Sequence, residues 1–309
     1  MVYDVVIVGG GPAGVTSAIY AKRSGLDVLL IEKGVIGGYI SNTMHLENYP
    51  GFDLISGMDF GERLKGQLEK FDVEILSDEV LQLKLDGGVK EVYTREGRYE
   101  AKTIIIASGT EHRRLDIKGE DVFIGRGVSF CATCDAPFYR GRKVAVVGGG
   151  NSAVDEALTL AGVASTTYLI HRRDVLRAEH IRQKQLIDAG VEILYNTEVR
   201  EIKGDSMVES LTIENKKTKQ VSELKVDGVF IAIGYIPSTL VAREAGIDVD
   251  GRGYIVVDRS QKTNVEGVYA AGDVTGGLMQ VTTAVGEGAI AAVSAFNHIR
   301  KPYWSEQVD

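Results

Sequence analysis

Few cysteines, few histidines and no long apolar run set the first limits on what this 309-residue chain can be. Cys131 and Cys134 are its only cysteines, and its five histidines are scattered along the chain. A zinc module needs a second cysteine or histidine pair at a regular spacing, so a single C-x-x-C pair argues against zinc, and we expect no metal site. No stretch reaches the roughly eighteen apolar residues that a membrane-spanning helix needs.

The chain also lacks an excess of positive charge. Its net charge is −8 and its isoelectric point is near 5.3, whereas nucleic acids and anionic membranes bind clustered positive charge, so we expect neither as the main partner. The amino-terminal apolar run contains Asp4 and has no basic residue ahead of it, which indicates a first β-strand rather than a signal peptide. We therefore expect a cytoplasmic protein, in which a dithiol that forms a disulfide is usually catalytic or sensory.

What the chain does have is an internal repeat. The segment V-V-I-V-G-G-G-P-A-G at 5–14 aligns without gaps on V-A-V-V-G-G-G-N-S-A at 144–153. Each copy is a short buried strand that leads into a glycine turn and then into a helical pattern, as in a Rossmann unit. A chain of this length holds about two domains, so the repeat predicts an α/β protein with two nucleotide-binding domains.

The first copy carries the complete G-x-G-x-x-G pattern. Its first glycine permits a tight turn, the second lets the backbone approach a pyrophosphate, and the third lets helix and strand pack closely. A helix over 13–24 offers its amino-terminal N–H groups to the phosphates. A strand over 27–31 ends in Glu32, which suits a plain adenosine ribose, as in FAD, and repels a 2′-phosphate. The predicted contacts are Gly9, Gly11, Pro12, Ala13, Gly14 and Glu32.

The second copy replaces that acid with cations. Here a strand over 166–170 ends in His171-Arg172-Arg173, and Arg177 follows. Guanidinium groups bind a phosphate monoester in a bidentate way, so this copy predicts a preference for NADPH over NADH. The competing interpretations are a purely structural glycine turn and a solvated start of a helix. The predicted contacts are Gly148, Gly150, Asn151, Ser152, Ala153, His171, Arg172, Arg173 and Arg177.

The C-x-x-C pair precedes the second copy in the segment S-F-C-A-T-C-D-A-P-F-Y-R. Two thiols separated by two residues can close a small disulfide ring, and beside a Rossmann unit this pattern predicts a redox-active dithiol. Asp135 follows Cys134 and can supply the proton that a leaving thiolate needs. The alternatives are an inert buried pair of cysteines and a turn-forming role for Asp135 before Pro137.

Near the carboxyl end, the pair Gly272-Asp273 follows a short apolar strand. An N–H group and an acceptor at this point suit a ribityl chain or its phosphate. A helical pattern rich in alanine and glycine then runs over 280–299. Residues 280–282 at its amino end would stabilise negative charge on the pyrimidine side of a reduced flavin. The alternative is a tightly packed core helix without a ligand.

Taken in order, these motifs resemble those of the low-molecular-weight flavoprotein thioredoxin reductases over nearly the whole chain. The matching segments are G-G-G-P-A-G at 9–14, E-N-Y-P-G at 47–51, C-A-T-C-D at 131–135, G-G-G-N-S-A at 148–153, H-R-R-D-V-L-R at 171–177, I-G-Y-I-P-S-T at 233–239 and A-A-G-D-V at 270–274.

The resemblance implies a fold with two Rossmann-like, three-layer nucleotide-binding domains, one inserted into the other. The discontinuous FAD-binding domain is expected to comprise residues 1–116 and 245–309. The NADPH-binding domain, with the C-x-x-C pair, is expected to comprise residues 117–244. The resemblance also implies a further set of FAD contacts: Gly38, Asn48, Gly272, Asp273, Gln280 and Val281.

The activity that the resemblance implies is that of an NADPH-dependent thioredoxin-disulfide reductase. NADPH would reduce FAD, which would reduce the disulfide through Cys134; Cys131 would then attack the disulfide of thioredoxin, with Asp135 as proton donor and acceptor. Thioredoxin or a similar protein is the implied partner, and the implied assembly is a homodimer. Three alternatives use the same fold or motifs: a flavoprotein reduced by ferredoxin or a dithiol, a ferredoxin–NADP reductase, and a redox sensor without turnover.

Overall fold

The structure is a computed structural model. It describes residues 1–42, 46 and 48–301, except for the side chains of Asn42, Thr133 and Cys134. Within this part of the chain, no helix is long and apolar enough to cross a membrane.

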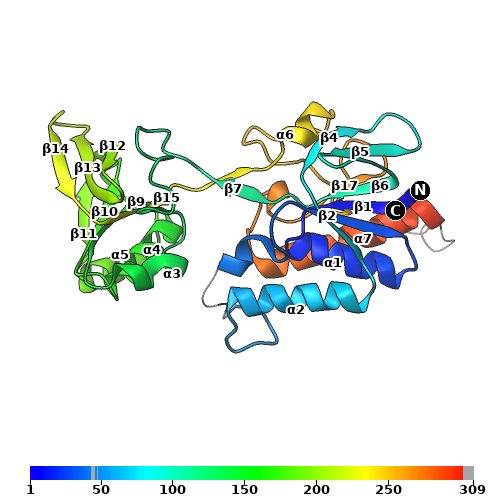
Figure 1. Ribbon diagram of the computed structural model, residues 1–309, viewed down its shortest axis with the longest axis horizontal. Helices are drawn as coiled ribbons and strands as arrows, with labels where there is room; N and C mark the ends of the chain where they lie inside the picture. Colours follow the sequence, from blue (N-terminus) through cyan, green and yellow to red (C-terminus); the bar gives the residue numbers. More distant parts are fainter. Residues whose placement is uncertain (43–45, 47, 302–309) are drawn as a thin grey trace. The chain divides into compact units, whose positions relative to one another are not determined.

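The chain divides into two compact units (Figure 1). The first consists of Met1–Glu111 and Ile236–Asp309, and the second, His112–Tyr235, is inserted between these two parts of the sequence. At the division, strand β7 (Thr110–His112) pairs with strand β16 (Tyr235–Pro237). The two units are described separately.

The first unit is built on a seven-stranded sheet. In sheet order, its strands are β3 (Glu74–Ser77), β2 (Val28–Glu32), β1 (Val2–Val8), β6 (Arg98–Ile106), β5 (Lys90–Thr94) and β4 (Val80–Lys84), and β17 (Val268–Ala270) also pairs with β6. Strands β1, β2, β3, β6 and β17 run parallel, whereas β4 and β5 form an antiparallel extension.

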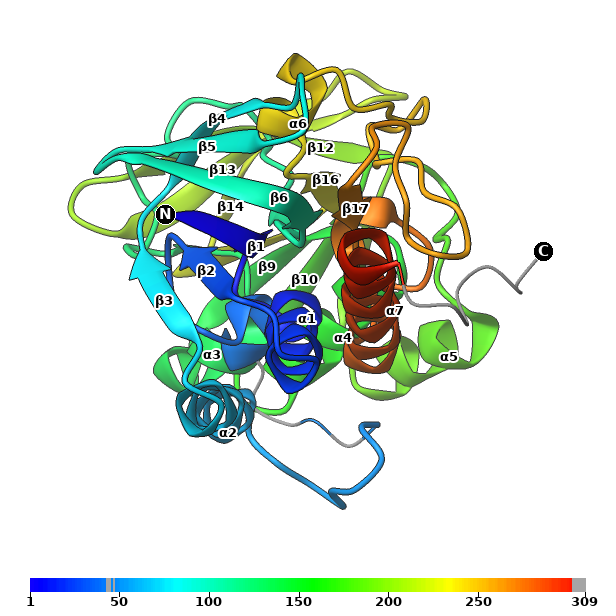
Figure 2. The ribbon, with the colours of Figure 1, turned by 90° about the vertical axis from the view of Figure 1, so that its right-hand side faces the viewer.

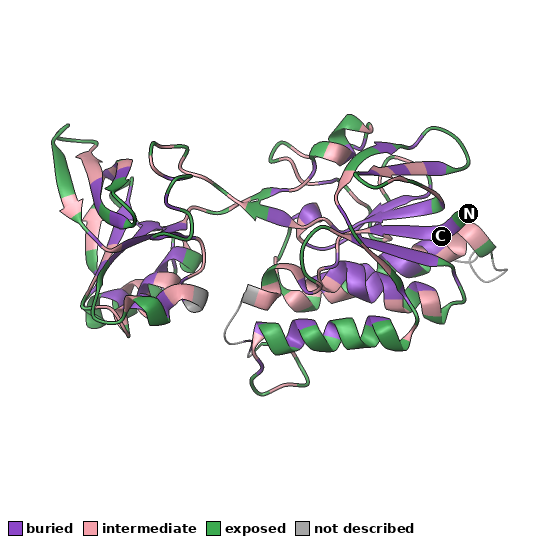
Figure 3. Cartoon of the chain, viewed as in Figure 1, coloured by how far each residue is buried: buried purple, intermediate pink, exposed green. Residues whose placement is uncertain are grey.

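The central strands are buried along most of their length, as Figure 3 shows. In β1, five consecutive residues are buried, which is the pattern of a parallel sheet covered on both faces rather than on one. One face packs against α1 (Pro12–Arg23), α2 (Gly57–Lys70) and α7 (Val281–Arg300) (Figure 2). The other face packs against residues of the β4–β5 hairpin and of α6 (Leu240–Glu244).

The second unit has a five-stranded parallel sheet of its own. In sheet order, its strands are β11 (Glu192–Tyr195), β10 (Thr166–His171), β9 (Lys143–Gly148), β15 (Gly228–Ala232) and β8 (Val128–Ser129). One face packs against helices, namely α3 (Ala132–Asp135), α4 (Asn151–Ala161) and α5 (His180–Asp188). The other packs against an antiparallel sheet of β12 (Thr197–Gly204), β13 (Val208–Asn215) and β14 (Val221–Lys225). The predicted α/β class, with two three-layer units, is confirmed.

The division between the units differs by a few residues from the boundaries proposed from the sequence. Residues 112–116 belong to the second unit, where Leu115 packs against the core. Residues 236–244 belong to the first unit, where Ala242 of α6 is buried in the core. Core packing places the changes of unit at 111/112 and 235/236, whereas the sequence placed them at 116/117 and 244/245.

Helices α1 and α7 pack against each other over a glycine. The Ser17 hydroxyl donates to the carbonyl oxygen of Gly288 at 2.9 Å. A Cβ added at Gly288 would lie 2.2 Å from the carbonyl oxygen of Ala13. That separation is far inside van der Waals contact, so a side chain at this position would force the two helices apart.

We expect Gly288→Ala to lower the free energy of unfolding by about 1–3 kcal/mol, because overpacking displaces the backbone. Gly286→Ala is the matched control on the same helix. Nothing lies within 4 Å of a Cβ added there, and alanine is favoured over glycine in a helix interior by about 1 kcal/mol. Urea unfolding of both variants measures the difference. Equal stability of the two variants would show that the helices separate without cost.

A buried carboxyl group lies on α4. Atom Oε2 of Glu156 has no hydrogen-bond partner among the described residues. Burial, with a smaller contribution from Asp155, raises the pKa of Glu156 to about 8. Because this pKa lies above the ordinary glutamate value of 4.5, the group's contribution to stability is fully present below about pH 4.5 and is lost as the pH rises through about 8.

We expect Glu156→Gln to raise the melting temperature more at about pH 8.5 than at about pH 5, because the amide carries no ionisation cost. Glu209→Gln removes an exposed carboxylate of the same unit and is the control. Thermal unfolding monitored by circular dichroism at both pH values gives the comparison. A change that is the same at both pH values would contradict the buried, neutral state of Glu156.

Candidate functional site

The first glycine turn joins β1 to α1 and is closed by backbone contacts. Gly9 has a φ of +108°, and a Cβ added there would lie 2.2 Å from the carbonyl oxygen of Ala107. A Cβ added at Gly14 would lie 1.9 Å from the carbonyl oxygen of Gly9. At Gly11, in contrast, nothing lies within 4 Å of an added Cβ. The turn is therefore tight on its inner side and open at Gly11, which leaves room for a phosphate.

Helix α1 starts at this turn without a side-chain cap. Gly11 is its N-cap residue, Pro12 follows, and the first turn contains no acidic residue. Its first N–H groups and the positive end of its dipole thus suit an anion. Glu32, at the end of β2, accepts hydrogen bonds from the amides of Gly10 at 2.5 Å and Gly34 at 2.6 Å. The predicted ribose acceptor is thereby held beside the turn.

Two other predicted contact residues lie against this turn. A Cβ added at Gly38, the first residue of the 3₁₀ turn η1 (Gly38–Asn42), would lie 3.3 Å from Cα of Gly11. A Cβ added at Gly272 would lie 2.9 Å from Cβ of Ala13. The structure therefore brings Gly38 and Gly272 to the same glycine turn from distant parts of the sequence.

The start of α7 carries a further pair of predicted contacts. Asn48 donates from Nδ2 to Oε1 of Gln280 at 2.8 Å. Gln280 is the N-cap residue of α7, which begins at Val281 without a side-chain cap and without an acidic residue in its first turn. This helix start keeps free N–H groups and can stabilise negative charge on a ligand.

Glu287 is a residue that the sequence analysis missed. It accepts hydrogen bonds from the amide of Gly272 at 2.7 Å and from the hydroxyl of Thr275 at 3.2 Å. Burial, together with the charge of Glu287, raises the pKa of Asp273 to about 6. One feature of the sequence could have revealed the role of Glu287, because it is the only charged residue between Val281 and Asn297. An isolated charge in a helix of small apolar residues indicates an internal partner.

The second glycine turn repeats the first with a small side chain at the third position. A Cβ added at Gly148 would lie 2.4 Å from the carbonyl oxygen of Ala232 and 2.5 Å from Cβ of Ala153. At Gly150, nothing lies within 4 Å of an added Cβ. Helix α4 begins after Gly150 with no side-chain cap and no acidic residue in its first turn. This turn, too, has the open backbone and free N–H groups that a phosphate needs.

The predicted 2′-phosphate residues separate into two groups. Arg172, Arg173 and Arg177 are exposed, and their side chains make no hydrogen bond or ion pair with any residue the structure describes. The nearby Asp174 pairs with Lys217 at 3.1 Å instead. His171 is only 6% exposed. The three arginines are thus available to an anion, whereas His171 lies inside the unit.

The side chains of Asn151 and Ser152 differ in their surroundings. The Asn151 side chain accepts from the amide of Glu179 at 2.9 Å and donates to its carboxylate at 3.3 Å. Ser152 is exposed on the first turn of α4. Asn151 therefore ties the start of α4 to the chain beyond Arg177.

The cysteine segment forms the short helix α3, followed by the 3₁₀ turn η2 (Ala136–Tyr139). Cys131 is disulfide-bonded, and its amide donates to the Ser129 hydroxyl at 3.1 Å. The chain's other cysteine is Cys134, whose side chain is outside the described part. Asp135 donates from its amide to the carbonyl oxygen of Cys131 at 3.2 Å. Among the described residues, no group of His, Cys, Asp and Glu side chains could hold a metal ion.

Tyr139 is a second residue that the sequence analysis missed. Its ring packs edge-on against the ring of Phe230, with 5.2 Å between the ring centroids. A Cβ added at Gly228 would lie 2.3 Å from Cε1 of Tyr139. Burial and, to a lesser extent, the charges of Asp135 and Asp227 raise the pKa of Tyr139. The aromatic ring thus anchors the cysteine segment to β15. The Asp135 carboxylate lies close enough for its charge to act on the Tyr139 hydroxyl.

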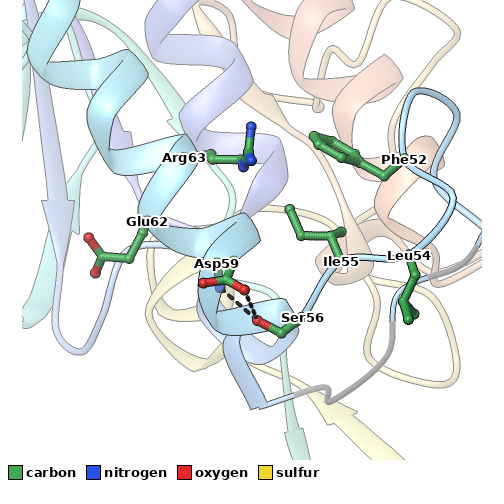
Figure 4. Close-up of a pocket in the computed structure, with 7 residues that line it drawn as sticks. All are labelled: Phe52, Leu54, Ile55, Ser56, Asp59, Glu62 and Arg63. Carbon is green, nitrogen blue, oxygen red and sulfur yellow. Dashed lines mark hydrogen bonds between the residues drawn. The ribbon is translucent and has the colours of Figure 1, made fainter.

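A surface hollow of about 760 Å³ lies beside α2 (Figure 4). It is lined by Phe52, Leu54, Ile55, Ser56, Asp59, Glu62 and Arg63. Ser56 caps α2 by accepting from the amide of Asp59 at 3.0 Å, and the Arg63 guanidinium lies 5.2 Å from the centre of the Phe52 ring. None of the predicted site residues lines this hollow.

Comparisons with known proteins agree with this geometry. A model of the pyridine nucleotide-disulphide oxidoreductase family matches residues 3–288. A thioredoxin reductase from Listeria innocua is 42% identical over 304 residues, which cover 97% of this chain and 95% of that protein. The structure of Lactococcus lactis thioredoxin reductase in its FR conformation has a TM-score of 0.89 and 40% identity, covering 97% of this chain and 100% of that one.

A relative with a different name is also similar. The structure of a ferredoxin-flavin thioredoxin reductase from Clostridium acetobutylicum has a TM-score of 0.54 and 36% identity, covering 97% of this chain and 99% of that one. The family model and the identities of about 40% both extend over nearly the whole chain. This α/β oxidoreductase therefore belongs to the pyridine nucleotide-disulphide oxidoreductase family and, within it, to the low-molecular-weight thioredoxin reductases.

Proposed function

We propose that this protein is an NADPH-dependent thioredoxin-disulfide reductase that carries FAD in its first unit and NADPH in its second. The observation that carries the proposal is the set of three exposed arginines, Arg172, Arg173 and Arg177, whose side chains have no partner among the described residues. Guanidinium groups without an internal carboxylate are available to bind a 2′-phosphate bidentately. They follow the end of β10, where the 2′-position of a nucleotide lies in a Rossmann unit.

The first unit supplies the residues that would hold FAD. The start of α1 and the open backbone at Gly11 suit its pyrophosphate, and Glu32 suits its adenosine ribose. FAD held by these residues would supply the redox chemistry, the transfer of an electron pair from the nicotinamide to the disulfide. The uncapped start of α7 would stabilise the negative charge that this step creates.

Disulfide exchange is the part of the reaction that we assign to the cysteine segment. The Cys131 thiolate attacks one sulfur of the thioredoxin disulfide, and the other thioredoxin sulfur leaves as a thiolate. Cys134 then displaces the second thioredoxin sulfur and re-forms the disulfide with Cys131, so thioredoxin gains the electron pair that the dithiol loses. Asp135 is the proposed proton donor to the leaving thiolate. Phe138, which follows in η2, is 80% exposed and suits contact with a protein substrate.

A second candidate function keeps the fold and the dithiol but takes electrons from ferredoxin or from a dithiol. The similarity to a ferredoxin-flavin thioredoxin reductase supports it. The unpaired arginines favour NADPH instead, because a ferredoxin-dependent enzyme has no 2′-phosphate to bind. A ferredoxin–NADP reductase is a weaker alternative, since its reaction needs no cysteine pair.

We expect NADPH to bleach the flavin band of the purified protein, under anaerobic conditions, at a concentration at least about tenfold lower than NADH does. Arg172→Gln should raise the NADPH concentration that bleaches the flavin band and leave the NADH concentration nearly unchanged. Arg182→Gln is the control, because Arg182 pairs with Asp155 at 3.4 Å on the same unit. Bleaching by reduced ferredoxin but by neither nucleotide would overturn the proposed donor and favour the second candidate.

We expect Phe138→Ala to raise KM for thioredoxin by about tenfold, because the variant loses an exposed aromatic contact with a protein partner. Reduction of the small disulfide DTNB should be unchanged, since it needs the dithiol but no protein surface. Steady-state NADPH oxidation with each substrate gives both values. An equal loss with thioredoxin and DTNB would show that Phe138 supports the cysteine segment itself.

A further inference from the structure

A second surface hollow, of about 690 Å³, lies along the carboxyl-terminal half of α7, the helix that packs beside β17 (Figure 2). We call it the α7 hollow. Its volume falls within the range of roughly 300–1,000 Å³ that is typical of pockets for small organic ligands. Its lining combines apolar side chains, Ile290 and Val293, with basic ones, Lys262, His298 and Lys301. None of the residues predicted to bind FAD lines the α7 hollow, so it is distinct from the first nucleotide site.

The walls of the α7 hollow are joined by buried hydrogen bonds. The hydroxyl of Tyr269 donates to the carbonyl oxygen of Ser294 at 3.1 Å. The hydroxyl of Ser294 donates in turn to the carbonyl oxygen of Ser260 at 2.8 Å. All three residues line the hollow, and Tyr269 is only 1% exposed. These bonds tie β17 and the chain before it to α7, so the hollow is formed before any ligand enters.

The basic side chains of the α7 hollow have no acceptor within the described part of the chain. Lys262 and Lys301 are exposed and His298 is half-buried, and none of the three side chains forms a hydrogen bond or ion pair there. The nearby carboxylate of Asp258 accepts instead from the amides of Ser260 at 2.8 Å and Lys262 at 2.9 Å. The positive charge of the hollow is therefore available to an anion from outside.

A buried ammonium group lies next to this hollow. Lys90, on β5, is only 4% exposed, and its side chain has no acceptor among the residues that the structure describes. A Cβ added at Gly267 would lie 3.1 Å from Nζ of Lys90 and 3.3 Å from Nε2 of His298. The two groups are thus neighbours, and His298 lines the hollow. Burial lowers the pKa of Lys90, against the charge of the exposed Glu266. A buried amine without an acceptor is costly, which indicates that its partner is a ligand.

We propose that the α7 hollow binds a small organic phosphate monoester, with the phosphate beside Lys90 and His298. Ammonium groups bind phosphate as point charges, and a phosphate monoester carries close to two negative charges at neutral pH. The apolar part of the ligand packs against Ile290 and Val293, which are 43% and 45% exposed. This site takes no part in either nucleotide site and does not depend on the proposed use of NADPH.

The test is isothermal titration calorimetry of the FAD-containing protein with phenyl phosphate, which joins a phosphate to an apolar ring. Excess NADP⁺ is present, so that the arginines after β10 do not contribute. Lys90→Met removes the buried charge and keeps a long side chain, and we expect it to weaken binding by about tenfold. Lys262→Gln should weaken it by about threefold. Because Lys262 is exposed, this second variant keeps the fold. Lys65→Gln removes an exposed lysine of the same unit, outside the hollow, and should change nothing.

Further ligands separate the charged part of the site from the apolar part. Inorganic phosphate should bind more weakly than phenyl phosphate, and benzyl alcohol, which has the ring without the charge, should not bind. Val293→Thr replaces a methyl group by a hydroxyl group of similar size. It should weaken binding of phenyl phosphate by about threefold and leave inorganic phosphate unchanged.

The absence of phenyl phosphate binding to the wild-type protein would overturn the proposal. Equal affinity of the wild type, Lys90→Met and Lys262→Gln would overturn it too, because the ligand would then bind elsewhere. An equal loss in Lys65→Gln and Lys262→Gln would show attraction by net charge alone. If Val293→Thr changed the association state of the protein and no ligand bound, the hollow would be a contact between copies of the chain instead.

Discussion

The two predicted nucleotide sites depend on the close approach of a backbone carbonyl group to a glycine at the end of a parallel strand. In the first unit, a Cβ added at Gly9 would lie 2.2 Å from the carbonyl oxygen of Ala107. In the second unit, a Cβ added at Gly148 would lie 2.4 Å from the carbonyl oxygen of Ala232. Each carbonyl belongs to the chain at the end of the neighbouring strand. At this contact the backbone turns sharply, and the following helix starts beside the sheet. No side chain caps the first N–H groups of either helix.

This constraint explains why so much of the fold could be predicted from the sequence. A strand, a glycine turn and a helix leave a recognisable pattern because no residue with a side chain can replace the glycine. The helix predicted over 13–24 is α1, Pro12–Arg23, and the helix predicted over 280–299 is α7, Val281–Arg300. The unpaired state of Arg172 and its neighbours could not be predicted, since the nearby carboxylate of Asp174 pairs with Lys217, in the turn between β13 and β14.

The residues that sequence reasoning missed act across long separations in the chain. Glu287 holds Gly272 only because α7 folds back beside that turn, and Tyr139 anchors the cysteine segment only because Gly228 leaves space for its ring. The boundaries between the units also follow from long-range contacts, because they depend on the core against which Leu115 packs and the core that buries Ala242. Such contacts leave no local periodicity in the sequence. They follow from packing, which the pattern of one segment does not contain.

The internal repeat shows how one scaffold can serve two nucleotides. At the equivalent strand ends, Glu32 accepts from a turn amide, whereas His171 faces a turn carbonyl group. In the first unit, a carboxylate therefore occupies one N–H group of the turn and places a negative charge beside it, which disfavours an additional phosphate. In the second unit, the histidine occupies no turn amide and adds no negative charge, and three unpaired arginines follow it. The change from a hydrogen-bond acceptor at Glu32 to a donor at His171 thus accompanies the change to the proposed 2′-phosphate site.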